Sequence, residues 1–377
     1  MKRILIYFAV AFIAFFSVSC DPVEGIAPEF PVKDKTVLIY MVGNNNLSSD
    51  AVRNLEDLKK GYVPSDDNLL VYYHTPVQSP LLLQLRTDET GAVLQDTVYR
   101  FPQRNSATAE SLKSAMQVTH TMFPANEYGL FLWSHGTGWL PSGHYSKSFG
   151  EESGVEMEIT DMVKAIPYKL SFVVFDACLM GCVEVAYQMK DSVDYVIASP
   201  AEILSTGFPY SKIMRHLYKT PADYISVAQE YYTYYNSMSG QSRSATISVV
   251  KTSELENLAA QTKNVFDKHR DNIAKLDYNS VQGYYRYNKY WFFDFGDFIK
   301  TIAGEEDAAP VFDALEKAVI YKAATPRFLD FAIDPNKYSG LSTYIPISPS
   351  DPVLDAFYSK FDWNRDAGMI LQEGANQ

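Results

Sequence analysis

The feature that most constrains the fold is a regular alternation of short apolar runs with longer amphipathic stretches in a chain of 377 residues. Such runs are typical of buried strands, and the amphipathic stretches are typical of helices. Their alternation predicts an open α/β fold with a mostly parallel sheet and helices on both faces. The expected strands are residues 36–42, 69–73, 130–134, 171–175 and 195–199, and the expected helices are residues 107–122, 161–166 and 179–190.

The pattern becomes more helical after about residue 210. We expect helices over residues 222–238, 253–274, 291–302 and 308–321, with strands over residues 245–250 and 341–347. Residues 81–86 and 92–99, joined around Thr90 and Gly91, have the alternation and the turn residues of a β-hairpin insertion.

The N-terminus has the pattern of an export signal. Lys2 and Arg3 precede thirteen uncharged, apolar residues, 4–16, which are too few for an ordinary membrane helix. Cys20 then follows a small residue, as in a bacterial lipobox, where the cysteine is acylated after cleavage before it, although Ser17 stands where such boxes usually have leucine. We expect a signal peptide over 1–19, a lipid-anchored Cys20 and a short tether over 20–32. Ordinary secretion with a cut near Ser19 is the alternative.

Charge and hydropathy limit the partners. The formal net charge is -12, and no stretch of Lys and Arg forms a basic stripe that could neutralise phosphates, so nucleic acid is excluded as an expected partner. No later apolar run approaches the roughly 20 residues needed to cross a bilayer. We therefore expect a protein of the cell envelope, at the outer membrane or cell surface, that contacts the membrane through its lipid anchor only. We also expect it to be a monomer.

Two cysteines other than Cys20 lie four residues apart, at 178 and 182. A disulfide across one helical turn is geometrically poor, and the sequence has no second Cys pair and no His pair at i, i+4 spacing for a metal site. Unpaired thiols in an exported protein need a reason. Burial as small apolar side chains is one reason, and we assign it to Cys182. A reactive role is the other, and it is open for Cys178.

Two expected strands end in residues that carry chemistry. His135 and Gly136 follow one strand and Cys178 follows another, and sites in such sheets form at the carboxyl ends of the strands. A thiol near an imidazole, at the start of the helix expected from Leu179, is favoured as a thiolate nucleophile. The N–H groups of Gly136 and Cys178 could donate to an oxyanion. A satisfied core histidine is the alternative for His135.

Three sequence blocks resemble the clostripain family of cysteine peptidases, in the caspase-like clan. They are residues 37–41 with Asn44 to Leu47, residues 133–139 around His135, and residues 175–180 around Cys178. The similarity extends over about residues 36–215. It implies a caspase-like three-layer α/β/α sandwich as the catalytic core, 33–215, with a helix-rich C-terminal portion, 216–377, packed on it.

The resemblance also implies an endopeptidase that acts on proteins or peptides. His135 would be the general base and acid, and Cys178 the nucleophile. Asp176, two residues before the nucleophile, matches a family position that contributes to a preference for Arg or Lys before the cut. A second acid found in basic-specific relatives is replaced here by residues 204–207, which leaves Glu202 as the nearest acid. A helix-capping role is the alternative for Asp176.

Residues 140–158 are poor in apolar side chains and contain three glycines, so we expect an exposed loop beside the site. Lys147 is its one Lys or Arg and is the expected point of autocleavage, as family members are activated by internal cutting.

No cofactor is expected for the chemistry. Calcium dependence occurs in the family, and the acids to suspect are Glu151, Glu152, Glu156, Glu158 and Asp161. Because they lack the spacing of an EF-hand, we interpret them as a solvated charged face. The alternative function is a non-catalytic surface lipoprotein that binds peptides or glycans through some of its 27 Tyr and 22 Phe.

Overall fold

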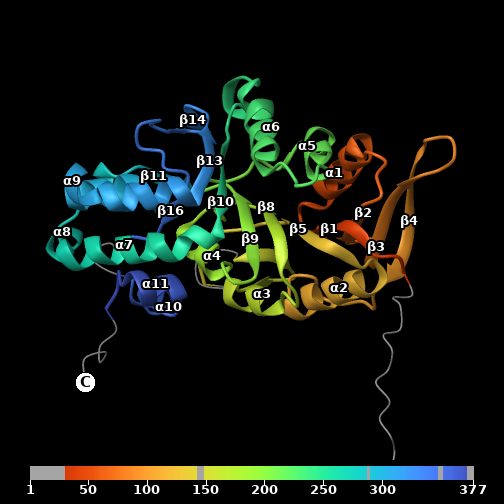
Figure 1. The fold of residues 1–377 in the computed structure, drawn as a ribbon, viewed down its shortest axis with the longest axis horizontal. Helices are drawn as coiled ribbons and strands as arrows, with labels where there is room; N and C mark the ends of the chain where they lie inside the picture. Colours follow the sequence, from red (N-terminus) through yellow and green to blue (C-terminus); the bar gives the residue numbers. More distant parts are fainter. Residues whose placement is uncertain (1–29, 142–147, 287–288, 347–350, 372–377) are drawn as a thin grey trace, which may run out of the picture.

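The computed structural model describes residues 30–141, 148–286, 289–346 and 351–371. Its largest sheet has nine strands (Figure 1). They are β1 (Lys33–Val42), β2 (Asn68–Thr75), β3 (Gln78–Thr87), β4 (Val93–Arg100), β5 (Ala125–Trp133), β8 (Leu170–Asp176), β9 (Val193–Ala198), β10 (Thr246–Lys251) and β13 (Val319–Ala324). Their order across the sheet is β13-β10-β9-β8-β5-β1-β2-β3-β4.

The five central strands, from β9 to β2, pair in parallel. An antiparallel pair extends the sheet at each side, β3 with β4 and β10 with β13. Of these nine strands, only β3 and β10 run against the others. The central strands read as continuous apolar runs because both of their faces are covered: along β1, Val37, Ile39 and Met41 pack on one side, and Leu38, Tyr40 and Val42 pack on the other.

Helices cover both faces of this sheet and make three layers (Figure 1). One face carries α1 (Ser48–Gly61), α5 (Tyr210–Leu217) and α6 (Tyr224–Asn236). The other carries α2 (Ala109–Met122), α3 (Ile159–Ala165) and α4 (Val183–Gln188). The mixed α/β fold with a large, mostly parallel central sheet that the sequence predicts is confirmed.

The remaining elements lie mostly in the C-terminal half. The helices are α7 (Leu255–Lys268), α8 (Arg270–Ala274), α9 (Phe295–Ala318), α10 (Pro352–Tyr358) and α11 (Asp362–Ala367). The short strands are β6 (Phe149–Glu152), β7 (Val155–Met157), β11 (Gly283–Arg286), β12 (Lys289–Asp294), β14 (Arg327–Phe328), β15 (Phe331–Ala332) and β16 (Ser342–Thr343). Single 3-10 turns occur at Gly240–Ser242, Thr252–Glu254 and Tyr278–Ser280. Among the described residues, no helix is both long and apolar enough to span a bilayer.

The C-terminal portion is joined closely to the rest. The strands β10 and β13 come from beyond residue 215 and belong to the central sheet. The sheet therefore continues across the expected domain boundary at residues 215 and 216. The division into two domains at that boundary stays a prediction. Trp139, after β5, packs its ring against Phe292, Tyr344 and Phe361. The loop that follows β5 therefore rests on aromatic side chains from the last hundred residues.

Three sequence expectations in this portion are wrong in part. Residues 289–294 form β12 rather than the start of a helix, because the Asp294 side chain accepts a hydrogen bond from the Asp297 N–H and caps a helix that begins at Phe295. The helix expected to reach residue 321 ends at Ala318, where β13 starts its pairing with β10. The strand expected over 341–347 is limited to Ser342–Thr343.

Candidate active site

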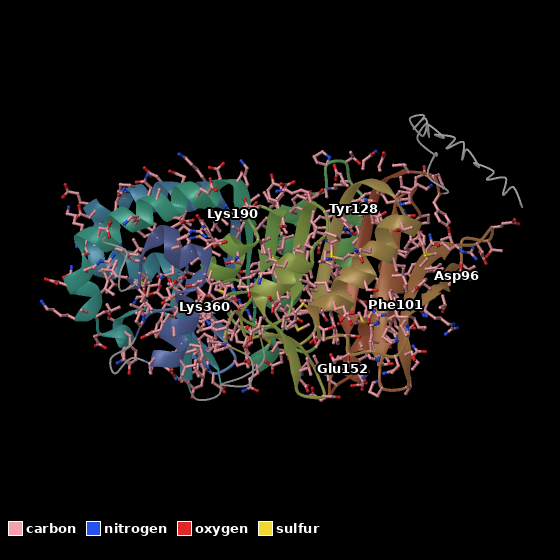
Figure 2. All side chains as sticks on the ribbon, turned by 90° about the horizontal axis from the view of Figure 1, so that it is seen from below. Asp96, Phe101, Tyr128, Glu152, Lys190 and Lys360 are labelled. Carbon is pink, nitrogen blue, oxygen red and sulfur yellow. The ribbon has the colours of Figure 1, made fainter. Side chains whose placement is uncertain are left out.

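The two chemistry-bearing loops leave neighbouring strands at the same edge of the sheet. Trp133, the last residue of β5, pairs with Asp176, the last residue of β8, and the two strands are parallel. His135 and Cys178 each lie two residues beyond these strand ends. Tyr128, near the start of β5, and Glu152, beyond its end, lie at opposite edges of the molecule (Figure 2). The site therefore forms where the carboxyl ends of parallel strands meet.

A pocket of about 170 Å³ opens between these loops. It brings His135, Asp176 and Cys178 together, three residues that the sequence singles out. Of the described residues that line it, Asp176 is the one acid, and Glu202 is not among them. The complete lining is Leu47, Trp133, Ser134, His135, Asp176, Ala177, Cys178, Ile203, Leu204, Ser205 and Gly207.

Backbone contacts position the Cys178 sulfur. The Ile203 N–H donates to Sγ at 3.3 Å, and Sγ lies 3.5 Å from the Ile203 carbonyl oxygen. The adjacent Leu179 has a φ of 62° and donates its N–H to the Ala201 carbonyl. The segment after β9 thus holds the nucleophile loop, and a donor N–H at the sulfur favours negative charge there.

The expected helix start at Leu179 is wrong. The helix α4 begins at Val183 with Cys182 at its N-cap position, and Gly181 instead donates its N–H to the Ser199 carbonyl. Because charge stabilisation by a helix is confined to its first turn, the helix effect invoked for the Cys178 thiolate does not apply. Cys182 is buried, and burial raises the pKa of its thiol well above the ordinary value, which fits a packing role.

The histidine loop lies directly against the nucleophile loop. A Cβ built on Gly136 would lie 2.8 Å from the Cys178 carbonyl oxygen and 3.0 Å from the Ala177 Cβ, so this approach requires glycine. The Gly150 N–H donates a hydrogen bond to the backbone carbonyl oxygen of His135. Its ring Nε2 lies 2.7 Å from the Asn46 Oδ1.

Asp176 is buried at the base of the pocket. The Phe208 N–H and the Tyr210 hydroxyl donate to its Oδ2 at 3.0 and 2.9 Å. Burial raises the pKa of this carboxyl to about 6, and the two hydrogen bonds oppose that shift. Asp176 ends a strand seven residues before α4 begins, so the helix-capping alternative is wrong.

Gly207 closes the pocket beside this carboxylate. Its φ is 71°, and a Cβ there would lie 2.7 Å from the Asp176 Oδ2 and 2.7 Å from the Asn54 Oδ1. Asn54 in turn accepts from the Trp133 Nε1–H and donates to the Thr206 carbonyl. Asn54 of α1 thus supports two parts of the pocket wall from behind, Trp133 of β5 and the loop that contains Gly207.

The comparisons with known proteins agree with this geometry. The model of the Clostripain family matches residues 39–370 of this chain. The chain belongs to the clostripain family. Membership makes it a cysteine peptidase by family and favours this reading over the non-catalytic binding lipoprotein.

Several relatives of this clostripain-family chain are known. Clostripain of Hathewaya histolytica is 28% identical over 218 residues, and the match covers 47% of this chain and 41% of clostripain. An inactive zymogen C11 protease from Parabacteroides distasonis has a similar structure, with a TM-score of 0.80, 37% identity and coverage of 90% of this chain and 99% of that one.

A secreted C11 cysteine protease from Bacteroides thetaiotaomicron, solved with an irreversible peptide inhibitor, gives a TM-score of 0.78 at 29% identity, covering 89% of this chain and 98% of that one. These neighbours have the caspase-like fold, which confirms the expected fold class.

Sequence reasoning missed three residues of the site. Asn46 contacts His135, and Phe208 and Tyr210 hold Asp176. Asn46 stands in one of the blocks that resemble the family, and Phe208 and Tyr210 lie within the similar span of residues 36–215, but their partners are 32 to 89 residues away in the sequence. The spacing of residues along the chain gives no sign of such contacts. The only signal for these three residues was therefore their place in the region that is similar to the clostripain family.

Other expected positions are placed as follows. Cys20 and Lys147 lie outside the described residues. Among the described side chains, no group of three or more His, Cys, Asp or Glu could hold a metal ion. The suspected acids occupy β6, β7 and the start of α3, where Glu156 accepts the Ser148 N–H and Asp161 pairs with Lys164.

Proposed function

We propose that this chain is an exported endopeptidase in which Cys178 is the nucleophile and His135 is the general base and acid. The observation that carries the proposal is the single pocket lined by both side chains and by Asp176, at the carboxyl ends of two adjacent parallel strands. Its support from outside the chain is the inhibitor-bound C11 protease, which shares the fold over most of its length.

The proposed reaction is acyl transfer through a thioester. His135 takes the thiol proton of Cys178, and the sulfur attacks the carbonyl carbon of the substrate peptide bond. The N–H groups of Gly136 and Cys178 donate to the oxyanion that forms, and the close approach of the two loops supports this pairing. His135 then gives its proton to the leaving amine. Water, activated by the same imidazole, hydrolyses the thioester and restores the thiol.

We assign Asp176 to the recognition of Lys or Arg before the cut bond. Its carboxyl group lies in the pocket that contains the nucleophile, and a cationic side chain entering that pocket would pair with it. Pairing would also offset the cost of an otherwise buried negative charge. Residues 203–205 and 207 line the same pocket, so their side chains limit how far a substrate side chain can enter it.

The dyad is tested by replacing each member and a matched thiol. Cys178→Ala and His135→Ala should each abolish hydrolysis of peptides with Lys or Arg before the cut bond, because the two groups act as a unit. Cys182→Ala removes a buried thiol four residues away and should keep the activity. Substantial turnover by pure Cys178→Ala protein, or equal loss in Cys182→Ala, contradicts the assignment.

The proposal includes latency and a cut after Lys147. The P. distasonis relative is an inactive zymogen, and Lys147 is the one Lys or Arg in residues 140–158. The Thr137 N–H donates to the Ser148 carbonyl, so the segment that follows Lys147 pairs with the histidine loop. A cut at this place would change the chain next to the site without removing either catalytic side chain.

We also propose that the chain is a monomer, anchored through acylated Cys20 in the cell envelope. The thiol and imidazole supply nucleophile and acid–base chemistry, so the proposed reaction uses no metal ion or cofactor. Activity that is unchanged after chelation with EGTA would support this, and restoration by added calcium would contradict it.

A further inference from the structure

The contact between His135 and Asn46 fixes which ring nitrogen can act as the base. The Asn46 side chain is oriented with Oδ1 toward the ring, 2.7 Å from Nε2. An amide oxygen has no proton to give, so in this orientation the proton of the hydrogen bond is on Nε2. In the neutral ring the lone pair then lies on Nδ1. When Nδ1 takes a proton, the Nε2–H becomes part of a cation and its bond to the Asn46 oxygen strengthens.

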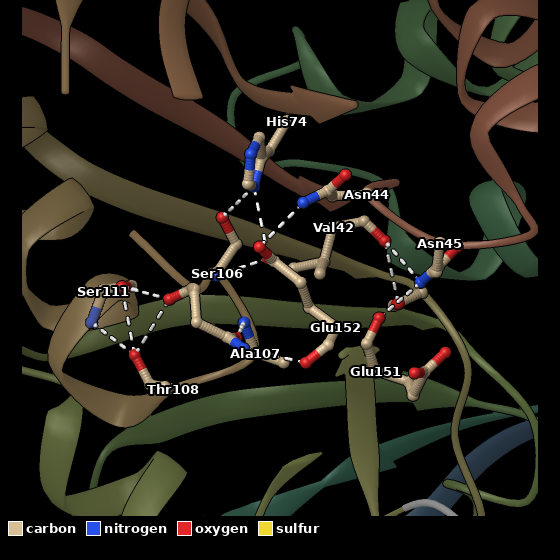
Figure 3. A network of polar contacts seen from close by, with 12 residues as sticks. Val42, Asn44, Asn45, His74, Ser106, Ala107, Thr108, Ser111, Glu151 and Glu152 are labelled. Carbon is tan, nitrogen blue, oxygen red and sulfur yellow. Dashed lines mark hydrogen bonds and ion pairs between the residues drawn. The ribbon is translucent and has the colours of Figure 1, made fainter. Parts of the chain in front are cut away.

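Asn46 is exposed and stands in a turn that is held by its two neighbours. The Asn45 side chain donates to the Glu151 carbonyl at 2.7 Å and accepts the Leu47 N–H at 2.8 Å. The Asn44 side chain donates to the Glu152 Oε1 at 2.8 Å. Figure 3 shows the Asn44 and Asn45 contacts meeting the end of β6. The turn is thus fastened to the strand that follows the histidine loop.

The Glu152 side chain is itself held in place by burial and hydrogen bonds. It is 4% exposed, and its Oε2 accepts the Ser106 N–H at 2.7 Å and lies 3.2 Å from the His74 Nδ1 (Figure 3). Burial lowers the pKa of His74, and the Glu152 carboxylate opposes this shift. The Glu152 carboxylate therefore accepts the Ser106 N–H and lies beside His74 while it also accepts from the Asn44 side chain.

This buried cluster is not a second catalytic triad. The Ser106 hydroxyl and the Glu152 carboxylate both contact the same nitrogen of His74, at 2.7 and 3.2 Å. A proton relay needs them on opposite nitrogens. Ser106 is also fully buried, beyond the reach of a substrate.

We propose that Asn46 is a positioning residue that orients His135 and stabilises its imidazolium form, and that Glu152 fixes the turn through Asn44. The inference rests on the proposed dyad of Cys178 and His135. It adds a third side chain to that dyad and gives the buried cluster a function in catalysis.

The pH dependence of Cys178 alkylation tests the first part, because alkylation needs no substrate and reports the thiolate. The titratable groups that line the pocket with His135 are Cys178 and Asp176. Asn46→Ala should raise the pH at which Cys178 becomes reactive to iodoacetamide by about 1 unit, and should lower kcat about 10-fold or more with little change in KM. Asn46→Asp should shift this pH downward and keep the activity.

Two comparisons make the result decisive. Asn257→Ala, an exposed asparagine on α7, should change neither quantity. If His135→Ala leaves the alkylation profile unchanged, the dyad itself fails and the inference falls with it. If His135→Ala shifts the profile but both Asn46 variants behave as wild type, or shift it in the same direction, the inference alone is overturned.

A double-mutant cycle tests the second part. Asn44→Ala should lower kcat several-fold, because the turn loses its contact with Glu152. In an Asn46→Ala background the same change should have no further effect, since Asn44 acts through Asn46. Losses of kcat that multiply in the double variant would overturn the role assigned to Glu152 and Asn44.

Discussion

Replacing Asp176 with asparagine should stabilise the free protein while weakening its action on basic substrates. The pKa of this carboxyl is about 6 in the fold, against 3.8 as the ordinary value. A difference of about 2 pH units corresponds to about 3 kcal/mol of unfolding free energy. Asparagine keeps an oxygen to accept from Phe208 and Tyr210, which both donate to one oxygen of the carboxylate.

The sign follows from proton binding. Between pH 3.8 and about 6 the folded protein holds a proton on Asp176 that the unfolded chain has lost, so stability falls as the pH rises through this window. Above pH 6 the cost is complete and constant. The advantage of Asp176→Asn should therefore be small at pH 4, grow to about 3 kcal/mol by pH 7, and then stop growing.

Urea unfolding measures this advantage, with Cys178→Ala in both proteins to prevent self-digestion. The activity arm uses the variant with an intact nucleophile. Its kcat/KM on a Lys substrate should fall about 100-fold, the loss expected when a buried charge loses its partner, while a neutral substrate changes little. In the wild type the Lys preference should rise between pH 5 and 7, and in the variant it should not.

The two arms can refute the reasoning separately. A variant that is less stable than the parent at pH 7 would show that burial of the charge is not costly. Unchanged discrimination between Lys and neutral substrates would show that Asp176 does not contact the substrate side chain.

Three further predictions concern the loops and the N-terminus. Gly136→Ala should lower kcat about 100-fold, because its methyl group would meet the Cys178 carbonyl at 2.8 Å and push the oxyanion donors apart; an unchanged kcat argues against this oxyanion site. Intact-mass analysis should find wild-type protein cut between Lys147 and Ser148, and both Lys147→Ala and Cys178→Ala as one chain; an uncut, fully active wild type removes autocleavage. Cys20→Ser should lose metabolic labelling by a fatty acid, and equal labelling of the variant would contradict the lipid anchor.

The central strands could be predicted because burial on both faces leaves a continuous apolar run, as in β1 and β8. The meeting of His135 and Cys178 could be predicted from the same sheet, since parallel strands end at one edge. These inferences need only local composition and one rule of topology.

The start of α4 could not be predicted, because Leu179 to Cys182 are apolar and fit a helix as well as a loop. The contacts that decide for a loop come from Ser199, Ala201 and Ser342, which no local pattern reveals. β12 was mistaken for a helix because its aromatic run suits either element. Asn46 could not be predicted either, because its exposed amide contacts the ring of His135, which is 89 residues away in the sequence.

Ser342 reaches the nucleophile loop from far along the chain. Its N–H donates to the Gly181 carbonyl, and the neighbouring Tyr344 N–H binds the buried Glu184 of α4. A ribosome delivers His135, Asp176 and Cys178 long before it delivers these partners. A growing chain thus carries every reacting group yet lacks the backbone that frames them. On the proposed function, the nucleophile loop of such a peptidase therefore gains its full backbone support only after residue 344 has been synthesised, late in the making of the chain.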